Sequence, residues 1–332
     1  MKISKRLVAG VIVMGLFFLT SCKKQDIQKD ETAAFLTSLN NTGTELTTSP
    51  AFNVLNDFNS KNPPIGFGGK RVIKFNGHEY NLPLKIEAKG VKGGIEDLYG
   101  TWEWQDTTGW VHVDPNNPQN GIQFRWTFYD TTFTAHQAAV LIDSIEIYVI
   151  GSDTLPQKVH IALYLDDTKI ADLSINLQYN TNEQITYLKV VFTVTNEFQI
   201  GVEAKNLQYD QDGSLIALQL HLWIIDYKNH NFRRDITLTV RSDDSGSIVY
   251  TDSDDWKLIM NVSAATQVVE NSITYEKRTV TGEITKDGRH AADITGTIWD
   301  PQDENHQTEI YVIFSDGSRE PITNYITIFQ SK

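Results

Sequence analysis

The chain has 332 residues, with 29 Lys and Arg against 42 Asp and Glu, so its formal net charge at pH 7 is −13. A chain of this length buries about 75% of the surface that it exposes when unfolded, so a hydrophobic core can stabilise it without disulfides. It holds a single cysteine. The acidic balance argues against nucleic acid as a partner, since phosphate binding needs clustered Lys and Arg.

The first predicted element is a targeting segment at the N-terminus. A basic stretch at residues 2–6 precedes thirteen mostly apolar residues, 7–19. This run is shorter than the roughly 20 helical residues that span a bilayer, so it indicates the apolar core of a signal peptide. It closes on the sequence Leu19-Thr20-Ser21-Cys22. The whole segment resembles the signal peptide and lipobox of bacterial lipoproteins.

That resemblance implies a membrane anchor at Cys22. In the lipoprotein family a peptidase removes the residues before the cysteine, here 1–21, and the cysteine carries acyl chains that hold the protein at a membrane. Lys23 follows Cys22, and in enterobacterial lipoproteins an Asp at that place retains the protein in the inner membrane. Lys23 therefore favours location in the outer membrane. The sequence does not indicate which face of that membrane the protein occupies. The alternative is an ordinary secretory signal followed by a chance cysteine.

The lipidated cysteine and a polar tether are predicted over residues 22–48, with at most a short helix among them. A clearer helix is predicted from Ser49, because Ser is a favourable N-cap and Pro50 suits the first helical position. It should end before Pro63, since the residue preceding a proline avoids the helical region. Its apolar face consists of Phe52, Leu55 and Phe58.

After this helix the hydrophobic period becomes about two residues, which predicts strand after strand. Asn76-Gly77 favours a tight turn and a first hairpin. Residues 172–179 and 188–194 alternate apolar and polar side chains, as strands with one buried face do. Residues 215–225 and 309–314 are apolar at nearly every position, so we predict that these are central strands covered on both faces.

The predicted fold is all-β: one short N-terminal helix and a large, predominantly antiparallel sheet of long hairpins, forming a curved sheet, a sandwich or an open barrel. The β-rich domain covers residues 49–332, either as one domain or as two parts that share a sheet, with a boundary near 151–157. Similar residues surround Asp166 and Asp287. We favour hairpins of similar geometry over an internal duplication as the reason.

The candidate ligand-binding residues are tryptophans. Trp102 and Trp104 lie two residues apart and would share one face of a strand, with Trp110 and Trp126 nearby in the sequence. Such rings either fill a β core or, if exposed, stack on sugar rings or cover an apolar ligand. His112 lies between two valines and is expected on the solvent face of its strand.

No catalytic residue, metal site or cofactor is expected. Glu103 and Asp106 could supply the two carboxylates of a glycosidase, but sequence does not fix their separation. Asp243-Asp244 and residues 252–255 are acidic clusters without EF-hand spacing, so we interpret them as solvated turns rather than Ca²⁺ ligands. The sequence holds no G-x-S-x-G, H-E-x-x-H or Walker motif.

These observations favour a membrane-anchored envelope lipoprotein that acts as a non-catalytic binding or structural module, attached to the membrane through Cys22. Two more specific alternatives stay open, because the same strand pattern suits both. One is a carrier that holds an apolar, lipid-like ligand in a β cavity. The other is a surface protein that binds glycan through exposed tryptophans. The oligomeric state is left open.

Overall fold

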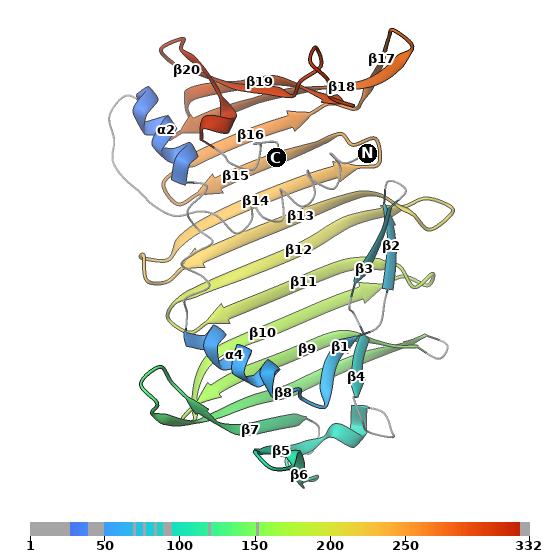
Figure 1. Ribbon diagram of the computed structural model, residues 1–332, viewed down its shortest axis with the longest axis vertical. Coiled ribbons are helices and arrows are strands. Elements are labelled where there is room, and N and C mark those ends of the chain that lie inside the picture. Colours follow the sequence, from blue (N-terminus) through green and yellow to red (C-terminus); the bar gives the residue numbers. More distant parts are fainter. Residues whose placement is uncertain are drawn as a thin grey trace. The chain divides into compact units, whose positions relative to one another are not determined.

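The computed structural model describes residues 27–38, 50–68, 71–75, 78–82, 85–88, 95–118, 121–150 and 153–325 (Figure 1). The lipobox and Cys22 lie outside these residues. Contacts between residues divide the chain into two compact units. We call Thr48–Leu215 the middle unit, and Met1–Thr47 together with Ile216–Lys332 the terminal unit.

The sheet of the middle unit is a ladder of long strands. Its strands are β5 (Gly100–Gln105), β6 (Gly109–Asp114), β7 (Ile122–Tyr129), β8 (Ala135–Ile150), β9 (Asp153–Leu165), β10 (Thr168–Tyr179), β11 (Ile185–Val194) and β12 (Phe198–Tyr209). They pair in the order β6-β5-β7-β8-β9-β10-β11-β12; β5 and β7 are parallel and the other neighbours antiparallel. The segments predicted as strands at 172–179 and 188–194 lie in β10 and β11.

Smaller elements complete the middle unit. β1 (Ile65–Gly68) pairs with β4 (Lys85–Ala88), and a 3₁₀ helix, η1 (Ile95–Leu98), precedes β5. β2 (Arg71–Phe75) and β3 (His78–Leu82) form an antiparallel hairpin, as Asn76-Gly77 predicts, although these two turn residues lie outside the described ones.

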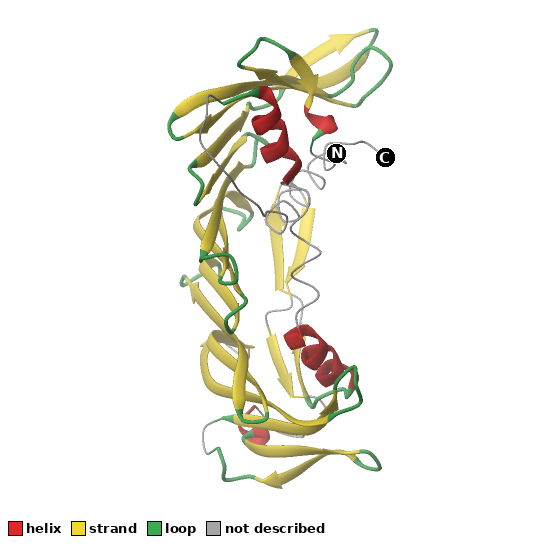
Figure 2. Cartoon of the chain, turned by 90° about the vertical axis from the view of Figure 1, so that its left-hand side faces the viewer, coloured by secondary structure: helices red, strands yellow, loops and turns green. Residues whose placement is uncertain are grey.

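The predicted helix is α4 (Pro50–Ser60). It begins at Pro50 and ends before Pro63, so both predicted limits are confirmed. Figure 2 shows that α4 lies on one face of the sheet of the middle unit. Val54 and Phe58 are buried against that face, as expected for an amphipathic helix that covers a sheet.

The terminal unit is a second ladder. It comprises α2 (Lys29–Ser38), β13 (Leu215–Asp226, of which Leu215 closes the middle unit), β14 (Phe232–Arg241), β15 (Gly246–Asp252), β16 (Trp256–Val262), β17 (Thr266–Glu270), β18 (Ile273–Lys286), β19 (Arg289–Asp300), β20 (Glu309–Phe314), β21 (Arg319–Pro321) and η2 (Ile322–Asn324). From β13 onward the strands pair antiparallel in chain order, except that β16 pairs with β18, and β17 folds back on β18.

α2 is a packed helix within the segment predicted as a tether. Leu36 is fully buried, and the ring of Phe35 stacks on Trp256 with centroids 4.4 Å apart. Ion pairs from Lys29 to Glu320 and from Glu31 to Lys286 fix its first turn. The structure therefore has two α-helices among the described residues where the sequence predicted one. The contacts that hold α2 come from residues more than 200 positions away.

The predicted fold class is confirmed: strands dominate, they are mostly antiparallel, and the sheet is not closed. Of the residues near the predicted boundary, 153–157 belong to β9 in the middle unit. The segments around Asp166 and Asp287 both form hairpins whose two turn residues have positive φ. This common geometry accounts for their similar residues.

The two strands predicted as covered on both faces differ from that expectation. In β13, Leu222, Trp223 and Ile224 are buried in succession, whereas the residues from 216 to 221 are half-buried. In β20 the prediction is wrong, because buried residues alternate with less buried ones. The neighbouring strand β21 is also only three residues long. On the less buried face, the guanidinium of Arg319 lies 3.7 Å from the ring centroid of Tyr311.

A pair of leucines in β13 tests this burial. Leu222 is 8% exposed and Leu220 is half-buried. We expect Leu222→Ala to lower the free energy of unfolding by about 2–5 kcal/mol, because it leaves a cavity. Leu220→Ala should cost about 1 kcal/mol, since less apolar area is lost. Urea denaturation measures both, and equal losses would contradict the burial of β13.

Candidate functional site

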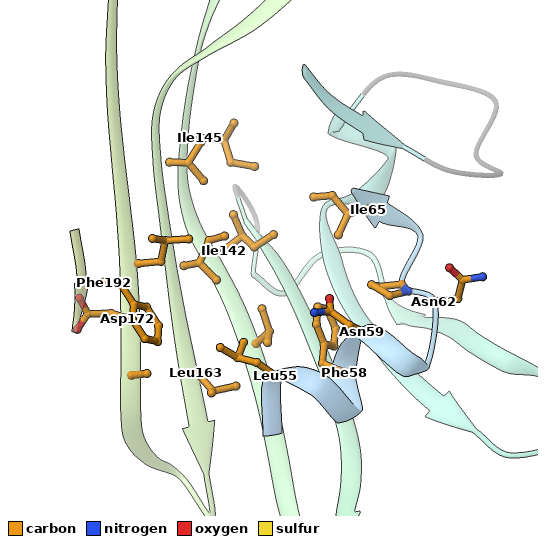
Figure 3. Close-up of a pocket in the computed structure, with 16 residues that line it drawn as sticks. Leu55, Phe58, Asn59, Asn62, Ile65, Ile142, Ile145, Leu163, Asp172 and Phe192 are labelled. Carbon is orange, nitrogen blue, oxygen red and sulfur yellow. The ribbon is translucent and has the colours of Figure 1, made fainter. Parts of the chain in front are cut away.

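The middle unit contains an apolar pocket with a volume of about 500 Å³, between α4 and the strands beneath it (Figure 3). α4, the loop after it and β1 form one side, and β8 to β11 form the other. Most of its lining is aliphatic or aromatic. The lining residues are Leu55, Phe58, Asn59, Asn62, Pro63, Ile65, Val140, Ile142, Ile145, Val159, Ile161, Leu163, Ala171, Asp172, Leu173 and Phe192.

The register of the strands builds the floor of this pocket. Ile142, Ile161, Leu173 and Phe192 lie opposite one another in a row across β8, β9, β10 and β11. Side chains in register on antiparallel strands point to the same face, so these four residues form one continuous apolar stripe. A second row joins Val140, Leu163 and Ala171 in the same way.

The other face of these strands is polar. The Nδ1 atom of His160 lies 2.6 Å from Oδ1 of Asp143, and Nζ of Lys158 lies 2.8 Å from Oε2 of Glu146. These are exposed cross-strand pairs between β8 and β9. A sheet with one charged face and one apolar face must cover the apolar face with another element, and here that element is α4.

α4 supplies the opposite wall. In Figure 3, Leu55 and Phe58 extend from the helix toward Ile142 and Leu163 of the sheet. Helical spacing places Leu55, Phe58 and Asn59 on one face of α4. The chain then turns at Asn62, whose φ of 52° is a left-handed value that asparagine tolerates. This turn brings Ile65 of β1 to the pocket.

The cover is incomplete, and this defines the site. Ile145, Ile161, Leu173 and Phe192 keep partial exposure although they lie on the covered face. Polar groups in the lining are few. Asn59 supplies an amide, whereas the side chains of Asn62 and Asp172 point away from the pocket (Figure 3), and Asp172 forms an ion pair with Lys169 at 3.0 Å. A largely apolar pocket of this size with a few polar groups is typical of small-molecule binding.

The predicted tryptophans gather beside this pocket but do not line it. Phe58 of α4 is the centre of the aromatic cluster, with ring centroids 5.8 Å from Trp110, 5.5 Å from Phe124 and 5.2 Å from Trp126. Trp104 contacts Trp110 at 5.6 Å and Trp102 contacts Phe124 at 6.5 Å. The structure therefore brings the four tryptophans into one cluster, largely packed ring against ring.

Each of the four indole N–H groups has a partner within the protein. Trp126 donates to Oδ2 of Asp57 at 2.8 Å and Trp110 to the carbonyl of Lys61 at 3.0 Å. Both acceptors lie at the C-terminal end of α4, so these bonds fix the helix on the sheet. Trp102 donates to the Leu98 carbonyl at 2.9 Å, and Trp104 donates to Oδ1 of Asp106 at 3.0 Å.

His112 lies against the aromatic cluster rather than on the solvent face. Its ring stacks on Trp102 with centroids 4.4 Å apart and an interplanar angle of 3°. Its Nε2 atom donates to the Tyr99 carbonyl at 2.9 Å. Glu103 is exposed, and Asp106 is the acceptor of the Trp104 indole.

The acidic clusters act as turn caps. Oδ1 of Asp252 accepts the backbone N–H groups of Asp254 and Trp256, and Oδ2 of Asp244 accepts Nη2 of Arg278 at 2.9 Å. The Thr132 hydroxyl and the Thr134 N–H hold the pKa of Asp130 at about 2 in the same kind of turn. Within the described ranges, no group of three His, Cys, Asp or Glu side chains could hold a metal ion.

Comparison with protein-family models, with curated proteins and with solved structures finds no match for this chain. Among the helices that the structure describes, none is both long and apolar enough to cross a membrane. The site must therefore be interpreted from its own chemistry.

Sequence reasoning identified the parts of the pocket but not the pocket. Leu55 and Phe58 follow helical spacing and Leu173 follows strand alternation, which are local patterns. The space between them depends on how far α4 stands from the sheet, and Trp110 and Trp126 set that position through bonds to α4. The spacing of apolar residues along the sequence does not predict the distance between α4 and the sheet.

The aromatic cluster is testable through two of its tryptophans. Trp126 is 2% exposed and bonded to Asp57, whereas Trp104 is half-exposed. We expect Trp126→Ala to reduce the free energy of unfolding by about 3–5 kcal/mol. Trp104→Ala should cost about 1 kcal/mol. Thermal and urea unfolding compare them; an equally small loss in both variants would show that the cluster is not a core.

Proposed function

We propose that this protein is a non-catalytic binding module that holds an apolar, lipid-like molecule in the pocket of the middle unit. One observation carries the proposal, namely a partly open pocket of about 500 Å³ between α4 and four strands with a mainly aliphatic lining. Pockets of roughly 300–1,000 Å³ suit small ligands. A hydrocarbon chain fits this lining because it needs few hydrogen-bonding partners.

Burial gives the energetic argument. Partly exposed side chains such as Ile161, Leu173 and Phe192 present apolar surface to solvent. Covering such surface gains about 25 cal/mol for each Å² removed from water. A lipid-like ligand would complete the cover that α4 leaves unfinished. The amide of Asn59 would then bind the polar end of the ligand.

The glycan-binding alternative draws no specific support from the positions of the tryptophans. Sugar binding needs an exposed ring face. Trp126 is buried, Trp102 stacks on His112, and Nζ of Lys61 lies 5.5 Å from the ring centroid of Trp104. If the pocket binds no ligand, the protein has a purely structural role in the envelope.

Two lysine substitutions in β10 test the carrier. Leu173 lines the pocket and Ile170 does not, yet both are half-buried on the same strand. A lysine at 173 places a charge in the apolar pocket, so Leu173→Lys should weaken binding of a neutral apolar fluorophore such as N-phenyl-1-naphthylamine at least tenfold. Ile170→Lys should bind as the unchanged protein does. Fluorescence titration measures both.

Urea denaturation of both variants is the control, because only variants that remain folded are informative. Native mass spectrometry of protein purified from envelopes in mild detergent should also show retained lipid-like mass. The carrier would be refuted by a lack of saturable fluorophore binding in the unchanged protein. Equal binding by Leu173→Lys would place the ligand elsewhere.

We further propose that Cys22 is acylated and anchors the protein in the outer membrane, as the lipobox implies. Cys22→Ser should leave a precursor that is neither cleaved nor labelled, because the peptidase of this pathway acts after modification of the thiol. Metabolic labelling with palmitate and separation of inner and outer membranes measure both points. A cleaved, soluble product from Cys22→Ser would refute the anchor.

A further inference from the structure

A second cavity lies in the terminal unit, beneath α2. Its volume is about 130 Å³, and its lining is mostly polar and charged, unlike that of the first pocket. α2 forms one wall, and β14, β15, β16 and β18 form the other. The lining residues are Glu31, Ala34, Phe35, Ser38, Phe232, Arg234, Tyr250, Asp252, Asp254, Trp256 and Lys286.

Three charged residues and a tryptophan lie on neighbouring strands at this level of the sheet. Arg234 of β14 lies opposite Asp252 of β15, and Trp256 of β16 lies opposite Lys286 of β18. Arg234 has the same strand phase as the buried residues Phe232 and Ile236, so its side chain points to the inner face of the sheet. Arg234 is thus a charged residue at a position where the alternation of the strand predicts a buried apolar side chain.

Arg234 has no acceptor for the end of its guanidinium group. The residue is 2% exposed, and neither Nη1 nor Nη2 has a hydrogen-bond partner among the described residues. Its guanidinium carbon lies 4.2 Å from the ring centroid of Phe232, a cation–π contact that does not satisfy the N–H groups. Buried charged groups are normally paired and hydrogen-bonded.

Three other charged groups of the cavity, Glu31, Lys286 and Asp252, already have partners. Lys286 forms an ion pair with Glu31 of α2. Asp252 accepts the Tyr250 hydroxyl at 2.7 Å through Oδ2 and two backbone N–H groups through Oδ1. Nη1 and Nη2 of Arg234 therefore remain strong donors without an acceptor in the described part of the chain.

We propose that this cavity binds a small carboxylate, whose two oxygens accept Nη1 and Nη2 of Arg234. Arginine recognises carboxylates through two parallel N–H bonds, which suits two orphan donors on one guanidinium. The volume equals that of about four waters, since each water takes about 30 Å³ in the liquid. A carboxylate with one or two carbons beyond it therefore fits.

Charge selects the carboxylate over phosphate. Glu31, Asp252 and Asp254 also line the cavity, and like charges repel a dianion more than a monoanion. The nearby carboxylates thus disfavour phosphate at neutral pH while one negative charge can be balanced by Arg234. The source of the carboxylate is either a free short-chain acid or the end of a longer molecule.

Binding in the cavity should also stabilise the packing of α2 against the sheet. Four of the lining residues belong to this helix, so a bound carboxylate would stabilise the docked helix more than a detached one. Hydrogen exchange of the α2 backbone should slow when ligand is added. This readout distinguishes binding under α2 from binding elsewhere on the chain.

The test uses the full-length protein purified in mild detergent. Sodium acetate and sodium propionate should raise the unfolding temperature in a saturable way, relative to sodium chloride at equal ionic strength, and should slow exchange in α2. Sodium phosphate should not. Octanoate that competes with acetate would indicate the end of a longer molecule, and octanoate that fails to compete would indicate a free short acid; both support the carboxylate site.

Three arginine variants provide the controls. Arg234→Met keeps the length of the side chain and removes the orphan charge, so it should fold yet lose the acetate response. Arg234→Lys should weaken the response at least tenfold, because it loses the two-pronged geometry. Arg233→Met changes the exposed neighbour, which pairs with Asp235, and should respond normally. An unchanged response in Arg234→Met, or no saturable response in the unchanged protein, would overturn the proposal.

Discussion

The apolar face of the long antiparallel strands is the constraint on which each unit depends. Strand alternation gives every unit one face rich in Ile, Leu and Val, and that face must be removed from water. In each unit one α-helix contributes to the cover, and each helix is held by an aromatic residue, Phe58 in α4 and Phe35 in α2. A single helix is narrower than the sheet that it covers. Cavities arise at its margins, and both candidate sites lie there.

Some of the acidic residues cap turns. Four hairpins have the same turn geometry. In each, the side-chain oxygen of an Asp or Asn accepts the backbone N–H groups of the residues two and four positions later. The residue three positions after this Asp or Asn has positive φ. A carboxylate suits this geometry because it can accept several N–H groups at once. In the acidic cluster at 252–255, the carboxylate of Asp252 therefore serves as a turn cap. The four capping residues are Asp130, Asn180, Asp210 and Asp252.

Local signals predicted local structure, and contacts between distant residues decided the rest. Asn76-Gly77 and the Pro50 helix start are complete within a few residues, so the β2–β3 hairpin and α4 could be predicted. α2 was not predicted as packed, because Trp256 and Lys286 hold it from far along the chain. β20 was misjudged because a run of apolar residues does not show that alternate positions stay partly exposed, as they do in this strand.

The candidate sites show the same division. The tryptophans were identified as an important cluster, but their burial depends on Phe58 arriving from α4. Arg234 had a local signal that was missed: in the β14 segment it falls in phase with Phe232 and Ile236. Strand alternation alone thus marks a buried charge, although it cannot show whether an acceptor lies nearby.

Comparison of two buried arginines shows why Arg234 is unusual. Arg278 is also buried; its Nη2 donates to Asp244 at 2.9 Å and to Glu276 at 2.8 Å, and of its buried nitrogens only Nε has no partner among the described residues. Two carboxylates thus offset the cost of removing that charge from water. Arg234 has a carboxylate directly across the ladder in Asp252, but that group is occupied by Tyr250 and by the turn that it caps. Among the described residues the turn is satisfied whereas Nη1 and Nη2 of Arg234 are not, which is the arrangement expected of a binding site rather than of a structural ion pair.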